Sequence, residues 1–352
     1  MIDPAVHQTL LKGIAIPATP LALSASRKFD ERRQRALYRY YRAAGARGLA
    51  VGVHTTQFAI RRPEHGLFRP VLELAAESAR EWLGARARTF ALVAGAVGQT
   101  KQAVAEAELA ASLGYDLVLL SLGALQDATD AELVAHCRVV ADVLPVFGFY
   151  LQPAVGGRVL GYDFWRAFAE IERVWAIKIA PFNRYQTIDV VRAVAEAGRN
   201  DIALYTGNDD SIVADLLTPF GINVGGSRVV RWIDGGLLGQ WAVWTHGAVQ
   251  MLTAIKRMRA QVATIDREWL TTGAALTDAN GAIFDAAHGF AGCIPGIHEV
   301  LRRQGLLEGT WCLDPHETLA DGQADEITRV TRSYPELSDD AFVKEHIDEW
   351  MR

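Results

Sequence analysis

The stretch Val174–Ala180, VWAIKIA, is an apolar run that carries one charged side chain, Lys178. A continuous apolar run of this length is expected for a parallel strand that is covered on both faces. A lone ammonium group inside such a strand is costly to desolvate, and burial shifts a lysine towards its neutral amine. A neutral amine is a nucleophile whose best-known use is a Schiff base with a carbonyl substrate. The run alone leaves open a lysine at the strand end whose side chain reaches water.

Seven further runs of strand character accompany this stretch along the chain. The eight expected strands cover residues 13–19, 48–53, 89–94, 116–121, 145–150, 174–180, 202–205 and 221–224. Amphipathic segments lie between them; Asp30 is expected to cap a helix over 31–44, and Thr100 a helix over 101–113. Eight alternations of strand and helix predict an α/β fold, a (β/α)8 TIM barrel with additional C-terminal helices. A doubly wound open sheet is the alternative, and it is disfavoured because no GxGxxG follows the first strand.

The chain from about residue 236 onwards is expected to be helical, without further strands. The expected helices there cover residues 240–260, 323–332 and 339–351. The predicted division is therefore a barrel over residues 1–235 and a C-terminal helical region over residues 236–352. We expect this region to pack on the barrel or against a neighbouring subunit.

Composition and charge exclude several classes of protein. The chain has 352 residues, 50% of them hydrophobic, and a formal net charge of −5. It offers no basic stripe for nucleic acid, and no apolar stretch approaches the ~18 residues of a membrane span. The N-terminus has no charged region followed by an apolar one, so no signal peptide is expected. The three cysteines have no CxxC spacing and indicate free thiols in a reducing compartment. We therefore expect a cytoplasmic protein with no nucleic-acid or membrane partner.

Residues that follow the strands are the candidates for chemistry, because active sites of such barrels lie at the C-terminal ends of the strands. The candidate segments are His54-Thr55-Thr56-Gln57 after the second strand, Tyr150-Leu151-Gln152-Pro153 after the fifth, Lys178 on the sixth and Gly207-Asn208-Asp209-Asp210 after the seventh. The eighth expected strand ends at Val224 and is followed by Gly225-Gly226-Ser227.

These segments resemble motifs of the dihydrodipicolinate synthase and N-acetylneuraminate lyase family of class I aldolases. The family patterns are Gly-Thr-Thr-Gly-Glu, Tyr-Asn-x-Pro, Gly-Ile-Lys and Gly-Asp/Asn-Asp, and they fall on residues 54–58, 150–153, 176–178 and 207–210. The resemblance covers roughly residues 10–300, with the motifs in the family's order.

The resemblance implies a Schiff-base mechanism, in agreement with the interpretation of Lys178. Lys178 would attack the ketone of pyruvate or of another 2-oxo acid, and the protonated imine would act as an electron sink. Tyr150 would be the proton shuttle, and Thr55 and Thr56 would hold the substrate carboxylate. The expected catalytic residues are Lys178, Tyr150 and Thr56, and the expected substrate-binding residues are Thr55, Thr56, His54, Gly207 and Val224. The resemblance implies a homotetramer or homodimer that uses no cofactor and no metal.

Each assignment has a structural alternative. Tyr150 can be a core tyrosine, the two threonines can form an ordinary turn, and His54 can pack beside the second strand. For Asn208, Asp209 and Asp210, helix capping is the favoured role.

Three departures from the family bear on the substrate. Val155 stands where the synthases have an arginine for the carboxylate of their second substrate. The segment 121–124 lacks the tyrosine that reaches a neighbouring subunit, and His54 replaces a glycine. We therefore expect a pyruvate-dependent aldolase or lyase other than a true dihydrodipicolinate synthase. A 2-oxo-acid dehydratase, a hydratase-aldolase and a non-catalytic 2-oxo-acid-binding protein stay open. Scattered histidines disfavour a metal-dependent aldolase, and a phosphate-binding isomerase would use residues 225–227.

Overall fold

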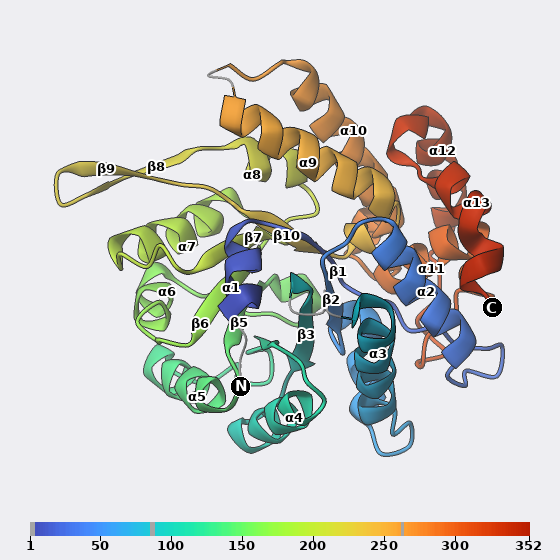
Figure 1. Cartoon of the computed structure of the whole chain (residues 1–352), viewed down its shortest axis with the longest axis horizontal. Helices are drawn as coiled ribbons and strands as arrows, with labels where there is room; N and C mark the ends of the chain where they lie inside the picture. Colours follow the sequence, from blue (N-terminus) through green and yellow to red (C-terminus); the bar gives the residue numbers. More distant parts are fainter. Residues whose placement is uncertain (1–3, 85–88, 262–263) are drawn as a thin grey trace. The chain divides into compact units, whose positions relative to one another are not determined.

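The computed structural model describes residues 4–84, 89–261 and 264–352 (Figure 1). Eight strands form one sheet in the order β1-β10-β7-β6-β5-β4-β3-β2, which is the order of a (β/α)8 barrel. Contacts divide the described chain into two compact units, residues 4–14 with 89–237, and residues 15–84 with 238–261 and 264–352. The predicted fold class is confirmed, while the expected division at residue 235 stays a prediction.

The first unit contains a run of parallel strands that pair in chain order. The strands are β3 (Ala91–Ala96), β4 (Leu117–Leu120), β5 (Val146–Leu151), β6 (Val174–Ala180) and β7 (Ala203–Thr206), and the start of β10 (Gly235–Leu238) pairs with β7. The helices are α1 (Pro4–Leu11), α4 (Thr100–Ser112), α5 (Asp130–Val143), α6 (Tyr162–Phe168), α7 (Arg184–Glu196) and α8 (Ile212–Leu217). The strands are almost fully buried, as their continuous apolar runs predict.

The register of β5, β6 and β7 separates two faces of the sheet. Phe149 pairs with Lys178, which pairs with Tyr205, and paired residues share a face. We call this the Lys178 face. The other face is covered by helices, since a Cβ on Gly148 would lie 2.8 Å from the ring of Phe168 on α6.

The second unit holds β1 (Ala15–Pro17), β2 (Gly48–Val51) and most of the C-terminal helices. The helices are α2 (Glu31–Ala43), α3 (Phe68–Leu83), α9 (Thr245–Gln261), α10 (Glu268–Ile283), α11 (Cys293–Arg303), α12 (Gln323–Ser333) and α13 (Asp340–Trp350). A parallel bridge joins Ala18 and Ala50 beyond β1 and within β2. The last helix packs on α2, where the Tyr40 hydroxyl donates to Asp339 at 2.7 Å.

Helix ends follow the expected capping chemistry only in part. Asp30 caps α2, since its side chain accepts the N–H of Arg33 at 3.0 Å, as predicted. Thr100 is not a cap; it is the first residue of α4, and its hydroxyl bonds to His136 at 2.9 Å. Among the described residues, no helix has the length and apolar character needed to cross a membrane.

The expected eighth strand is wrong. Residues Phe220–Val224 form β8, which pairs antiparallel with β9 (Ser227–Arg231) in a separate hairpin, the long two-stranded arm in Figure 1. Gly225 and Gly226 make its turn with φ of +55° and +84°, a conformation that glycine adopts without strain. The eighth strand of the sheet is β10, so the expectation that no strand follows residue 235 is also wrong.

Candidate functional site

Lys178 is buried on the Lys178 face near the end of β6, with 8% of its surface exposed. Its Nζ lies over the ring of Phe149, 4.5 Å from the ring centroid. An aromatic face attracts a positive charge. Of the two interpretations of this lysine, the buried one is confirmed and the solvated one is wrong.

Gly207 follows β7 and leaves the space that the Lys178 side chain occupies. Its N–H donates to the carbonyl of Ile179 at 2.7 Å, which holds it beside β6. A Cβ on Gly207 would lie 2.6 Å from Cε of Lys178 and 2.8 Å from Cβ of Ala180. The close approach of this backbone to the lysine therefore depends on glycine.

Tyr150 lies on the face opposite Lys178. It pairs with Ile179, its hydroxyl accepts the N–H of Leu160 at 3.1 Å, and its ring packs 5.3 Å from that of Trp165 on α6. Burial raises the pKa of the Tyr150 phenol, which makes it a poorer proton donor near neutral pH. The ring beside the Lys178 amine is that of Phe149, and the role of Tyr150 as a proton shuttle stays a prediction. The orientation of Tyr150 follows from the register. Phe149 pairs with Lys178, and the next residue of a strand points to the opposite face.

A buried carboxylate fixes the residues on either side of Gly207. Asp215 on α8 is fully buried and accepts hydrogen bonds from the hydroxyl of Thr206 at 2.6 Å and from Nδ2 of Asn208 at 2.9 Å. Arg184 donates to its other oxygen at 2.5 Å. Burial raises the pKa of Asp215, and the Arg184 charge opposes that shift. Sequence reasoning missed Asp215, which nothing in the expected strand ends indicates.

Asn208 has a structural role rather than a catalytic one. Its Oδ1 accepts the N–H of Phe182 at 3.0 Å, and its Nδ2 also donates to Thr187 at 3.1 Å. Asp210 does not cap the next helix, because the residue before α8 is Ser211. These bonds join the segment after β6 to the segment after β7.

The residues His54, Thr55 and Thr56 form a 3-10 turn in the second unit. The Thr56 hydroxyl donates to the carbonyl of Thr19 at 2.7 Å and accepts the N–H of Gly52 at 3.0 Å. The Thr55 hydroxyl donates to the same Thr19 carbonyl at 3.3 Å. The two hydroxyls therefore stabilise the turn itself. The ring of His54 lies edge-on to that of Phe58, with centroids 6.0 Å apart.

The structure brings only some of the predicted residues together. Lys178 and Gly207 are in contact distance within the first unit, and His54, Thr55 and Thr56 share the turn in the second. Val224 ends β8 and pairs with Ser227 in the separate hairpin, so it does not end a strand of the eight-stranded sheet, and its substrate-binding role stays a prediction.

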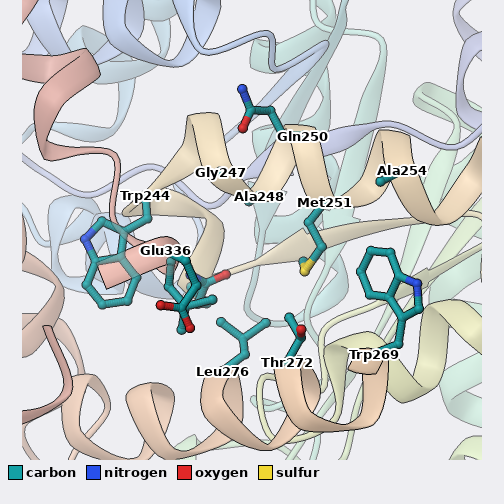
Figure 2. A pocket seen from close by; sticks show the side chains of 12 residues that line it. Trp244, Gly247, Ala248, Gln250, Met251, Ala254, Trp269, Thr272, Leu276 and Glu336 are labelled. Carbon is teal, nitrogen blue, oxygen red and sulfur yellow. The ribbon is translucent and has the colours of Figure 1, made fainter. Parts of the chain in front are cut away.

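Two of the cavities among the described residues lie within the second unit. One, of about 340 Å³, lies between α9 and α10 and has an apolar, aromatic wall that includes Trp244, Met251 and Trp269, with Glu336 as its single charged residue (Figure 2). The other, of about 510 Å³, is lined by acidic residues, His288 and Arg329. Neither contains a predicted site residue. Within the described ranges, no three His, Cys, Asp or Glu side chains are placed to hold a metal, and the three cysteines are free.

Comparison with solved structures identifies the fold. Dihydrodipicolinate synthase from Agrobacterium tumefaciens superposes with a TM-score of 0.72 at 19% identity, covering 94% of this chain and 100% of that one. N-acetylneuraminate lyase from Fusobacterium nucleatum gives 0.69 at 16% identity, covering 92% and 99%. The chain has the fold of the dihydrodipicolinate synthase and N-acetylneuraminate lyase family. YagE from E. coli K12, a prophage protein of that family solved with pyruvate, gives 0.72 at 18% identity, covering 92% and 98%.

Sequence comparison reaches the same family over part of the chain. A 4-hydroxy-tetrahydrodipicolinate synthase from Acaryochloris marina is 27% identical over 203 residues, 57% of this chain and 60% of that protein. Another from Cyanothece sp. is 29% identical over 163 residues, 46% of this chain and 50% of that protein. The chain thus spans between half and three fifths of the curated relatives it matches. No family model matches it.

Proposed function

We propose that this protein is a lyase that forms a Schiff base between Lys178 and pyruvate or another 2-oxo acid. The observation that carries the proposal is the burial of Lys178. This residue of β6 packs against Phe149 on β5 and Gly207 after β7. The names of the curated relatives and the pyruvate bound to YagE support the same substrate class. We further propose that the protein acts in the cytoplasm as a homotetramer or homodimer.

The proposed reaction starts with the neutral amine of Lys178. Its lone pair attacks the C2 carbonyl carbon, and a proton is transferred to the oxygen to give a carbinolamine. The oxygen then takes a second proton and leaves as water, and the nitrogen lone pair forms the C=N bond of the protonated imine. This cation accepts the electron pair of a bond broken at C3, or supplies an enamine for a bond formed there.

The turn at residues 54–56 is assigned to the substrate carboxylate. The hydroxyls of Thr55 and Thr56 already donate to the Thr19 carbonyl. The proposal therefore gives this role to the backbone amides of the turn and to the His54 ring. Thr55→Val should then leave the apparent Kd for pyruvate within about threefold, because in this assignment the Thr55 hydroxyl donates to the Thr19 carbonyl and not to the substrate. A loss of binding would assign the carboxylate to the hydroxyl.

The reaction is proposed to differ from that of a true dihydrodipicolinate synthase. Val155 cannot pair with a carboxylate, and the 121–124 segment holds no tyrosine. A dehydratase or hydratase-aldolase reaction on the same imine uses the same amine. One observation favours a second candidate, a 2-oxo-acid-binding protein without turnover: Tyr150 faces away from Lys178, so it offers no proton shuttle.

Borohydride trapping tests the proposal. The protein is incubated with pyruvate, reduced, digested and searched for a mass adduct on the peptide that carries Lys178. An adduct on that peptide, absent in Lys178→Ala, supports the Schiff base. An adduct without cleavage or condensation of any 2-oxo acid or aldehyde supports the binding protein instead. The absence of an adduct with every 2-oxo acid tested would rule out the Schiff base.

A further inference from the structure

Two neighbours of Gly207 are held by one buried carboxylate. Thr206 and Asn208 both donate to Oδ2 of Asp215, at 2.6 and 2.9 Å. Asp215 has no exposed surface, and its other oxygen accepts from Arg184 at 2.5 Å. Hydrogen bonds to an ionised acceptor are shorter and about twice as strong as neutral ones. The carboxylate thus fixes the backbone on both sides of the glycine.

The same residues tie β6 to β7 beyond their ladder. Asn208 accepts the N–H of Phe182 at 3.0 Å, two residues after β6 ends. The Gly207 N–H donates to Ile179 at 2.7 Å, one residue after Lys178. The position of the Gly207 backbone relative to Lys178 is therefore set by bonds that converge on Asp215 and Asn208.

The Gly207 backbone in this position bounds the space that the Lys178 side chain occupies on the side of β7. Even the absent Cβ of Gly207 would fall 2.6 Å from Cε of Lys178 and 3.0 Å from its Cγ. Because the lysine side chain packs in the space that Gly207 leaves, its position depends on the position of the Gly207 backbone. A nucleophile displaced by about 1 Å can lose about 10²-fold in rate.

We propose that Asp215 is a positioning residue for Lys178, acting through Thr206, Gly207 and Asn208. This inference rests on the proposed function, in which the Lys178 amine is the nucleophile. Arg184 completes the arrangement by balancing the buried charge. The carboxylate contacts no reacting atom in this assignment; it acts only by holding the wall against which the lysine side chain packs.

The test compares imine formation in four variants. Asp215→Ala removes the clamp, and Asp215→Asn keeps one acceptor oxygen for Thr206 and Asn208. Thr206→Val removes one bond while preserving the side-chain shape. Glu106→Gln is the matched control, since Glu106 is a buried carboxylate of the same unit, 7% exposed, that accepts the N–H of Val97 at 3.1 Å.

We expect the rate of borohydride-trapped imine formation at saturating pyruvate to fall about 10²-fold in Asp215→Ala. A smaller loss, about 10-fold, is expected in Asp215→Asn and Thr206→Val, because part of the clamp survives. The control Glu106→Gln should form the imine at the wild-type rate, even if its unfolding midpoint drops as far as that of the Asp215 variants. Equal rates in folded Thr206→Val and wild type would overturn the inference, and so would an equal loss in the control.

A second measurement reads the lysine without turnover. The chain has six lysines, so reductive methylation with ¹³C-formaldehyde gives few methyl NMR signals. The signal that is missing in Lys178→Arg belongs to Lys178. The Lys178 signal should move in Asp215→Asn and stay in place in Glu106→Gln. An unmoved signal in Asp215→Asn would overturn the positioning role. A Lys178 signal that moves in Asp215→Asn, together with a wild-type protein that forms no imine, would instead refute the proposed function alone.

Discussion

Replacing Gly207 with alanine tests the packing of the candidate nucleophile. The added Cβ would lie 2.8 Å from Cβ of Ala180, about 1 Å closer than the ~3.5–4.0 Å of an optimal carbon contact. Ala180 is fixed to β6 and cannot yield without moving the strand, and Lys178 Cε would lie closer still, at 2.6 Å. The backbone φ of Gly207 is not positive, so alanine adds no backbone strain and the destabilisation comes from the clash. Overpacking of this kind costs about 1–3 kcal/mol of unfolding free energy.

The same substitution should also slow the reaction of Lys178. If Lys178 moves by about 1 Å, imine formation with pyruvate should slow about 10²-fold. Stopped borohydride trapping measures the rate, and urea unfolding measures the stability. Gly281→Ala on α10 is the matched control, since nothing lies within 4 Å of its added Cβ. Its free energy of unfolding should rise by about 0.5–1 kcal/mol, because alanine favours a helix interior over glycine. Wild-type stability and wild-type imine formation in Gly207→Ala would refute the packing argument.

Three further predictions follow from single contacts. Tyr150→Phe should keep imine formation within about threefold of wild type and lose about 1–3 kcal/mol of stability, because the Leu160 N–H loses its acceptor; a proton shuttle would instead lose ~10²-fold in rate. Asp30→Ala should cost about 1 kcal/mol in urea unfolding, since it removes the cap of α2. Complete burial lowers the pKa of His298 to about 4 from 6.5, so the unfolded chain binds the proton more readily between these values. The unfolding free energy should therefore fall as pH drops from 6.5 to 4, by about 3 kcal/mol, and His298→Leu should lack this component; a pH-independent difference between the two proteins would contradict it.

Most of the sheet could be predicted from continuous apolar runs, because parallel strands covered on both faces carry them. Seven expected strands coincide with β1 to β7. The eighth strand, β10, gives no apolar run to predict it from, because it begins with Gly235-Gly236. The stretch 221–224 alternates apolar residues with others and leads into Gly225-Gly226, and this pattern is typical of a hairpin.

The candidate site could be predicted only in part, because side-chain orientation and long-range partners are not visible in a local sequence pattern. Lys178 and Gly207 follow from position in a strand and from residue type. The orientation of Tyr150 depends on register, which pairs Phe149 with Lys178 and turns the tyrosine to α6. Asp215 is a long-range partner on a short helix, so no local pattern indicates it.

The measurement that tests the central claim most directly is mass analysis of the Lys178 peptide after incubation with pyruvate and borohydride. The account predicts one reduced adduct on Lys178, none on the other five lysines, and none in Lys178→Ala, which should unfold at about the wild-type urea concentration. An unmodified Lys178 with every 2-oxo acid, or an equal adduct on solvent-exposed lysines, would contradict it.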